Sequence, residues 1–462
     1  MPNTLSTFLK LHKVPLVLAL LMLIFYYTFA YHLDRTDFIK LITLFAALFF
    51  LCFKLIQFEK WNFKFLLATG ILFRLVFLFA EPNLSQDFYR FIWDGELVSN
   101  FINPYVELPE ILIEQSNLVI ANAHELYNGM GTLSAKHYSN YPPLNQILFG
   151  LATVFGGKTI LGNIIVIRGI VILADIGIFY FGRKLLKQLN LSPHLIFWYF
   201  LNPLIIIELT GNLHFEGVML FFFIWGLYLI GSNKWKLAGI VYGISISIKL
   251  IPLLFLPLFL KHLGWKKSIL FYMVVGITCL LTFIPFYTPE FITNYSKTVG
   301  LWFSNFEFNA GLYNVIKQIA ITFDSKPWEL IKTYGKITQI TTIIIVLSYT
   351  FFKSNFKLSD LINSMLWILT LYYFIAPTVH PWYLVFLVML SILTPYRYAL
   401  LWSAVVILSY FAYSNTSYTE NLWVLVIEYV LVYGFLLYEI LTRSGKKVLF
   451  RKNLASNYEI SD

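Results

Sequence analysis

The sequence predicts an all-α integral membrane protein, a polytopic helical bundle with short interfacial helices in the loops of its outer face. The chain has 462 residues, of which 58% are hydrophobic and 13% are charged, whereas soluble domains average about 25% charged residues. The hydrophobic residues form long runs, and about 20 such residues span a bilayer as a helix. Lys and Arg concentrate in short loops between the runs, where they set orientation, so the net charge of +10 does not indicate nucleic acid.

About twelve apolar runs are expected to cross the membrane within one polytopic domain, residues 1–462. The expected spans are 14–30, 38–56, 63–80, 160–181, 194–209, 215–231, 268–286, 337–353, 361–377, 382–395, 398–412 and 421–441. With the N-terminus in the cytoplasm, the basic loops and the basic tail 442–462 lie inside. The two long loops, 81–143 and 288–336, are poor in Lys and Arg and then lie outside.

Two further apolar pieces, 144–156 and 238–260, are predicted to be re-entrant or broken. The first is short, and the second is interrupted at Lys249–Pro252. Counting each as one crossing would move the basic loops to the outside. Broken backbone at membrane depth survives only where it is buried in protein or lines a wet cavity, which makes Lys249 a candidate ligand-binding residue.

The stretch Ser85–Tyr105 places four charged residues, Asp87, Arg90, Asp94 and Glu96, close together in an otherwise apolar chain. Asp87, Arg90 and Asp94 are spaced i, i+3, i+7, so they share one face if residues 85–97 form a helix, with Ser85 as its N-cap. Two interpretations remain open. The stretch is either an amphipathic helix in the membrane interface with self-paired charges, or part of a functional site.

Further polar and aromatic groups are predicted at the same outer surface. They are Glu208, Asn212, His214 and Glu216 in one loop, His380, Trp382 and Tyr383 in another, and Asn305, Glu307 and Asn309 in loop 288–336. Structural alternatives exist, since acids cap helices and Trp and Tyr form interfacial belts. Inside one span, Arg168 and Asp175 are expected to pair with each other or to face a neighbouring helix, because unpaired charges are costly in lipid.

The string QDFYRFIWDGELVSNFINPY resembles the first outer-loop motif of GT-C glycosyltransferases. It is most similar to bacterial polyprenol-phosphomannose-dependent mannosyltransferases and, more distantly, to the GPI mannosyltransferase catalytic subunit. The matching residues, in chain order, are Asp87, Tyr89, Gly95, Asn103-Pro104-Tyr105, Tyr141-Pro142-Pro143, Asn202-Pro203, His214-Phe215-Glu216, Lys249 with Pro252, and His380-Pro381-Trp382-Tyr383. Two departures stand out. A single carboxylate, Asp87, replaces an Asp-x-Asp, which argues against a required divalent metal, and Glu216 replaces the Asp of a His-x-Asp.

The resemblance implies a GT-C-type bundle that performs inverting transfer of a sugar, with mannose the first choice. The implied partners are a polyprenyl-phosphate sugar donor, a glycan or glycolipid acceptor and the lipid bilayer, without nucleic acid. No cofactor is assigned, and a divalent metal stays a disfavoured alternative. Abundant Ile, Lys, Phe and Asn are typical of AT-rich bacterial genomes. The expected location is a bacterial inner membrane, with a periplasmic active site and cytoplasmic termini. The alternative is a polytopic transporter or flippase for a lipid-linked or anionic substrate, which would also need a broken helix.

Transfer to a hydroxyl needs a base, which typically contributes about 10²–10⁴-fold. Asp87 is the expected base, with Asp94 or Glu216 as second choice. The departing phosphate needs cations in a partly dry site, and Lys249, Arg90 and His380 are the candidates. The expected substrate-binding residues are Gln86, Tyr89, Asn103, Tyr105, Tyr141, His214, Trp382 and Tyr383.

Overall fold

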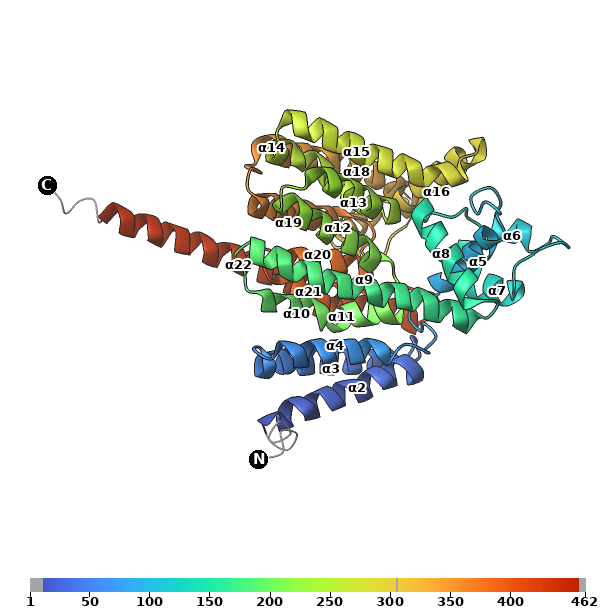
Figure 1. Cartoon of the computed structure of the whole chain (residues 1–462), viewed down its shortest axis with the longest axis horizontal. Coiled ribbons are helices and arrows are strands. Elements are labelled where there is room, and N and C mark those ends of the chain that lie inside the picture. The colour runs from blue at the N-terminus through green and yellow to red at the C-terminus, as the bar shows by residue number, and fades with distance from the viewer. Residues whose placement is uncertain (1–10, 305, 457–462) are drawn as a thin grey trace.

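The structure, a computed structural model, describes residues 11–304 and 306–456, so that Asn305 and the last six tail residues lie outside it. Its longer helices run along one common axis (Figure 1). They are α2 (Lys13–His32), α3 (Phe38–Glu59), α9 (Ile160–Gln188), α15 (Trp265–Phe283), α18 (Pro327–Phe352), α19 (Leu358–Ile375) and α22 (Leu422–Ser456). Within the described residues, seven helices are long and apolar enough to cross a membrane, and a bent pair would be an eighth. The chain is therefore a polytopic helical membrane protein, as predicted; the count of twelve crossings stays a prediction.

Shorter elements fill the bundle and cover one of its ends. The α-helices are α4 (Phe63–Leu75), α5 (Asp87–Ser99), α6 (Pro109–Leu112), α7 (Ala123–Ala135), α8 (Pro143–Gly156), α10 (Phe197–Phe200), α11 (Pro203–Ile205), α12 (Glu216–Gly231), α13 (Trp235–Ile248), α14 (Phe259–Leu263), α16 (Pro289–Ser304), α17 (Leu312–Ile321), α20 (Leu384–Ile392) and α21 (Tyr398–Val405). The 3₁₀ and π segments are η1 (Pro193–Ile196), η2 (Ile206–Gly211), η3 (Ile251–Leu258), η4 (Ile284–Phe286), η5 (Pro381–Tyr383) and η6 (Val406–Ser414). Helices α5 to α8 gather at the end of the bundle opposite to the start of α2 and the end of α22 (Figure 1).

The predicted break near Lys249 is present. Helix α13 ends at Ile248, Lys249 has extended backbone (φ −152°, ψ 135°), and η3 begins at Ile251. Pro252 explains the interruption, because proline lacks an N–H and disfavours helical geometry in the residue before it. The backbone carbonyl of Pro252 accepts a hydrogen bond from the Tyr242 hydroxyl at 2.7 Å, so the broken backbone is held by protein rather than exposed to lipid.

The expected span 194–209 is a bent pair of helices, and its crossing of the membrane stays a prediction. The helix breaks between Phe200 and Pro203 and bends by 53°, because Pro203 removes a backbone donor. Asn202 adopts extended backbone, and its side chain accepts a hydrogen bond from the N–H of Leu204. The second piece continues as the π-helix η2, which brings the following loop back toward α5.

Of the two alternatives expected for Arg168 and Asp175, the second is present: they do not pair with each other, and each faces a neighbouring element. Arg168 donates to the carbonyls of Thr210 and Gly211 at 2.7 and 3.0 Å. These carbonyls lie at the C-terminal end of η2, where backbone acceptors have no partner within the helix. Asp175 pairs with Arg74 of α4 at 2.9 Å, and both side chains are fully buried. These contacts fix η2 and α4 against α9.

The helix predicted over 85–97 begins two residues later, at Asp87, and Gln86 occupies the N-cap position in place of Ser85. Ser85 instead accepts a hydrogen bond from the N–H of Asp87 at 3.3 Å. Most side chains of α5 are buried against other parts of the protein, so it is not an amphipathic helix with one face free of protein contacts. It packs so closely on α8 that a Cβ atom on Gly95 would lie 2.5 Å from the backbone oxygen of Phe149.

Candidate active site

Residues from four separate parts of the chain meet near Asp87. Asp87 is the first residue of α5, and Glu216 is the first residue of α12. Both carboxylates therefore lie at helix N-termini, where unpaired N–H groups favour negative charge. Lys249 comes from the break after α13, and Tyr141 immediately precedes the Pro142–Pro143 pair that begins α8. The residues that set these helix boundaries therefore also position the side chains of Asp87, Glu216, Lys249 and Tyr141.

Lys249 is the centre of the electrostatic contacts. Its Nζ forms an ion pair with the carboxylate of Glu216 and lies 5.0 Å from the ring centroid of Tyr383. The Lys249 side chain is 37% exposed, whereas that of Glu216 is 5% exposed, so the ammonium group remains open to a ligand. Asp87 interacts electrostatically with both Lys249 and Glu216, and it accepts a hydrogen bond from Tyr141.

The pKa of the Asp87 carboxyl group suits a proton acceptor. Burial raises the pKa of its carboxyl group to about 6; Lys249 and the hydrogen bond from Tyr141 lower it, and the charge of Glu216 raises it further. Asp87 is therefore mostly ionised at pH 7, with a pKa much closer to that pH than the usual value near 3.8. A base works best when its pKa lies near the operating pH.

Four rings form a continuous stack beside Lys249. His214 lies 3.9 Å from Trp382, Trp382 lies 4.4 Å from His380, and His380 lies 4.8 Å from Phe308, all as centroid distances. Burial and the charge of Lys249 lower the pKa of His380 to about 3, and burial holds the pKa of His214 well below its usual value. His380 is therefore neutral at pH 7. The expectation that it supplies positive charge is wrong, although it retains one N–H donor.

A buried carboxylate holds His214. Glu208 is fully buried and accepts hydrogen bonds from the hydroxyl of Tyr410 at 2.8 Å and the amide of Asn212 at 3.2 Å. Its Oε2 lies 3.5 Å from Nε2 of His214, its backbone carbonyl accepts from the N–H of His214 at 3.3 Å, and the imidazole ring itself is positioned by stacking on Trp382. The sequence gives no signal that Tyr410, about 200 residues away, joins this group.

Arg90 and Asp94 form a separate, buried network. Nε of Arg90 donates to Asp94 at 2.7 Å, and the other carboxylate oxygen of Asp94 accepts from Ser139 at 2.7 Å and Gln146 at 3.0 Å. Asp94 is 0% exposed, so no substrate hydroxyl reaches it, and the geometry favours Asp87 as the base. The self-pairing of charges considered for this stretch is thus present in Arg90 and Asp94.

The Asn-Pro-Tyr motif makes hydrogen bonds that hold neighbouring segments of the protein. Tyr105 is 0% exposed, and its hydroxyl donates to the backbone carbonyl of Tyr141 at 2.5 Å. Asn103 donates to the carbonyl of Phe286 at 2.9 Å. The expected substrate contact of Tyr105 is therefore wrong, because its hydroxyl and ring are used to hold the segment that carries Tyr141.

Gln86 and Tyr89 also turn toward their own loop. The amide of Gln86 donates to the carbonyl of Met130 at 3.2 Å, and the hydroxyl of Tyr89 donates to Glu81 at 2.8 Å. The structure does not bring these two side chains to Lys249. Of the expected substrate-binding residues, those it does bring near Lys249 or the ring stack are Tyr141, His214, Trp382 and Tyr383.

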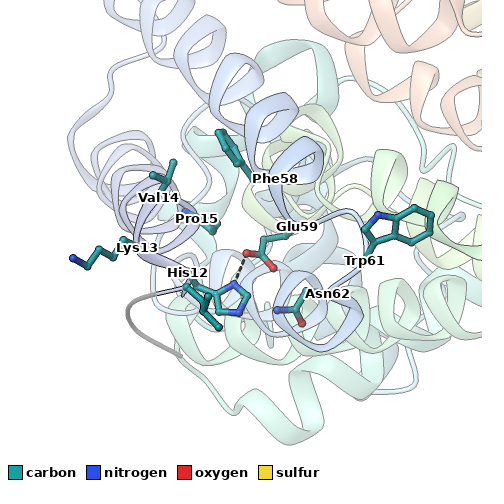
Figure 2. A pocket seen from close by; sticks show the side chains of 9 residues that line it. His12, Lys13, Val14, Pro15, Phe58, Glu59, Trp61 and Asn62 are labelled. Carbon is teal, nitrogen blue, oxygen red and sulfur yellow. Dashed lines mark hydrogen bonds and ion pairs between the residues drawn. The ribbon is translucent and has the colours of Figure 1, made fainter. Parts of the chain in front are cut away.

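A cavity of about 740 Å³ lies away from this site. Figure 2 shows its lining, where α2 begins and α3 ends, including the 2.5 Å contact between His12 and Glu59. This is the end of the bundle opposite to α5 (Figure 1), so the cavity does not belong to the Asp87 group. Among the described side chains, no three His, Cys, Asp or Glu residues are arranged to hold a metal ion.

Known proteins resemble this chain over part of its length. A family model described as alpha-(1->6)-mannopyranosyltransferase, N-terminal domain, matches residues 13–264. Alpha-(1->6)-mannopyranosyltransferase A of Corynebacterium glutamicum is 21% identical over 184 residues, which cover 39% of this chain and 35% of that protein. Its namesake in Mycobacterium tuberculosis is 20% identical over 342 residues, 68% of this chain and 62% of that protein. The match thus spans less than two thirds of either relative.

Proposed function

The chain belongs to the alpha-(1->6)-mannopyranosyltransferase family, and we propose that it transfers a mannosyl group from a polyprenyl-phosphate donor to a hydroxyl of a glycan or glycolipid. The acceptor oxygen attacks C1 of the sugar from the face opposite the phosphate, and the bond from C1 to the phosphate oxygen breaks with inversion. The acceptor proton passes to Asp87, and the leaving group is the polyprenyl phosphate. The family description supports an alpha-(1->6) product linkage.

The observation that carries this proposal is the convergence of Asp87, Lys249, Glu216 and Tyr141 from distant parts of the chain. Asp87 has the pKa of a base, and Lys249 presents a partly exposed ammonium group beside it. A fixed cation in a partly dry site stabilises the charge that grows on a departing phosphate. In this proposal Glu216 orients Lys249, and His380 contributes an N–H donor without positive charge.

We place the reaction at the outer, periplasmic face of a bacterial inner membrane, with both ends of the chain in the cytoplasm. Two observations support this side. The loops and the tail rich in Lys and Arg fall together when the long loops 81–143 and 288–336 are outside. Helices α5 to α8 lie at the end of the bundle opposite to the end of α22 (Figure 1); Asp87 begins α5, and Tyr141 lies in the loop between α7 and α8.

The test uses the purified full-length protein in lipid nanodiscs. Polyprenyl-phosphate mannose, glucose and arabinose are offered separately with short alpha-mannoside acceptors. We expect mannosylated acceptor and free polyprenyl phosphate in equal amounts, mainly from the mannose donor, and neither product from the Asp87→Asn variant. In a parallel vesicle assay, movement of intact lipid-linked sugar across the bilayer without phosphate release would contradict the proposal and indicate a transporter.

A further inference from the structure

The ring stack at the site ends on a residue from the second long loop. Phe308 lies against His380 and is fixed by backbone pairing with the segment that precedes His380. The N–H of Phe308 donates to the carbonyl of Pro377 at 3.0 Å, and the N–H of Val379 donates to the carbonyl of Phe308 at 2.8 Å. The backbone on both sides of the stack is thus tied together, and Phe308 blocks the free face of His380.

The next residue, Asn309, is held by the C-terminal helix α22. Asn309 is 0% exposed and has a positive φ of 49°, a geometry that needs support from its surroundings. Its side-chain amide donates to Glu428 at 3.1 Å, and its carbonyl accepts from the Tyr429 hydroxyl at 2.6 Å. Its N–H donates to Glu420, just before α22. The N–H, the side-chain amide and the carbonyl of Asn309 are therefore all hydrogen-bonded by α22 and by Glu420, which precedes it.

Glu428 is an unusual residue for a helix of this kind. It is 0% exposed in the apolar part of α22, and it accepts a second hydrogen bond from Nε1 of Trp402 at 2.8 Å. A buried carboxyl group is costly unless it is well bonded. No ion pair joins Glu428 to a Lys, Arg or His within the described residues. Packing alone would favour an apolar side chain here, so its bonds to Asn309 and Trp402 account for its presence.

We propose that Glu428, with Tyr429 and Glu420, acts as a positioning residue that holds Phe308 against His380 and so fixes the N–H that His380 offers to the donor. This inference rests on the proposed function for its kinetic consequence, and on geometry alone for its structural one. When the anchor is lost, Phe308 leaves the stack and His380 is free to turn. A lost hydrogen bond to the donor corresponds to a factor of about 2 to 12 in binding.

The main variants are Glu428→Leu and Glu428→Gln. Leucine removes both accepted hydrogen bonds, whereas glutamine keeps the carbonyl oxygen that accepts them. We expect Glu428→Leu to raise the KM for the lipid donor about 3- to 10-fold with kcat changed less than twofold, and Glu428→Gln to restore the wild-type KM. Hydrogen exchange of the Phe308 and Val379 amides should accelerate in the leucine variant and stay slow in the glutamine variant.

Glu439 provides a matched control on the same helix. It is 7% exposed and accepts hydrogen bonds from the backbone N–H groups of Arg397 and Tyr398, about three turns away from Glu428. Glu439→Leu should reduce stability but leave the donor KM and the Phe308 exchange unchanged. An equal rise of KM in Glu439→Leu, or a folded Glu428→Leu protein with wild-type KM and slow exchange, would overturn the proposal.

Two further outcomes distinguish failure of the Glu428 anchor from failure of folding or of the proposed function. If Glu428→Leu does not fold, Tyr429→Phe removes only the hydroxyl bond to Asn309 and should raise the KM in the same direction, by about 2- to 5-fold; no change would count against the anchor. If the wild-type protein transfers no sugar, the proposed function fails, but the exchange rates of Phe308 and Val379 still decide whether Glu428 holds this segment.

Discussion

Replacing Lys249 with methionine should shift the pH at which the enzyme loses activity in acid. Lys249 is the strongest influence that lowers the pKa of Asp87, which is about 6. A nearby opposite charge shifts a carboxyl pKa by about 1–3 units, and the 37% exposure of Lys249 places the effect at the lower end because solvent screens it. The expected pKa in Lys249→Met is therefore about 7, a change of about 1.4 kcal/mol.

This shift has a measurable size. Asp87 is the proposed base only when it is ionised. At pH 6 about one half of Asp87 is ionised in the wild type and about one tenth in Lys249→Met. At pH 8 about nine tenths or more is ionised in both proteins. The ratio of variant to wild-type kcat should therefore drop about fivefold between pH 8 and pH 6. Weaker binding of the donor phosphate adds a loss that does not depend on pH in this range, because a phosphate diester stays ionised.

The assay is the initial rate of mannosyl transfer at saturating acceptor, measured from pH 5 to pH 9 for the wild type, Lys249→Met and Lys249→Arg. Arginine keeps the charge, so its profile should retain a midpoint near the wild-type value. Thermal unfolding of each protein at each pH controls for loss of folded material. An acid midpoint near pH 6 in the methionine variant would refute the electrostatic link between Lys249 and Asp87.

Three further outcomes follow from the same contacts. Asp87→Asn should lower the transfer rate by about 10²–10⁴-fold with an unchanged melting temperature, and near-normal turnover would remove Asp87 as the base. Gly95→Ala should reduce unfolding free energy by about 1–3 kcal/mol, because its Cβ would lie 2.5 Å from the backbone oxygen of Phe149; denaturant unfolding measures this loss, and wild-type stability would contradict the close packing. Arg74→Met should cost about 3–5 kcal/mol by leaving the buried carboxylate of Asp175 unpaired, and in a double-mutant cycle Asp175→Leu should recover most of that loss; additive losses would show that the pair is not coupled.

Local chemistry made several features predictable. The Lys249–Pro252 break follows from proline within an apolar run, and charges that survive in such a run point to a functional or paired position. The same reasoning predicts a break at Pro203 in the span 194–209. That break was not predicted because the length of the apolar run was given more weight than the proline. Asp87 and Glu216 were singled out because each lies in a cluster of polar residues and matches a motif of the family that the sequence resembles.

Contacts between distant segments were beyond sequence reasoning. Nothing in the spacing of Arg168 and Asp175 shows that one meets backbone carbonyls and the other meets Arg74. Tyr105 was assigned to substrate because a tyrosine in a polar motif can be buried or exposed, and only the fold decides between them. Phe308 carried no signal of its own among the many aromatic residues of its loop, since its importance comes from the backbone pairing with Pro377 and Val379.

The origin of the site along the chain has a consequence for how such proteins diversify. Asp87, Lys249 and one ring of the stack, His214, lie within residues 13–264, the part that matches the family model. The other three rings, Phe308, His380 and Trp382, come from the remainder. The charged groups of the candidate site thus come from one part of the chain, and three of the four stacked rings come from the other. In a chimeric protein joined near residue 264, His214 of one parent would have to stack on Trp382 of the other, so such proteins test whether the two parts are interchangeable.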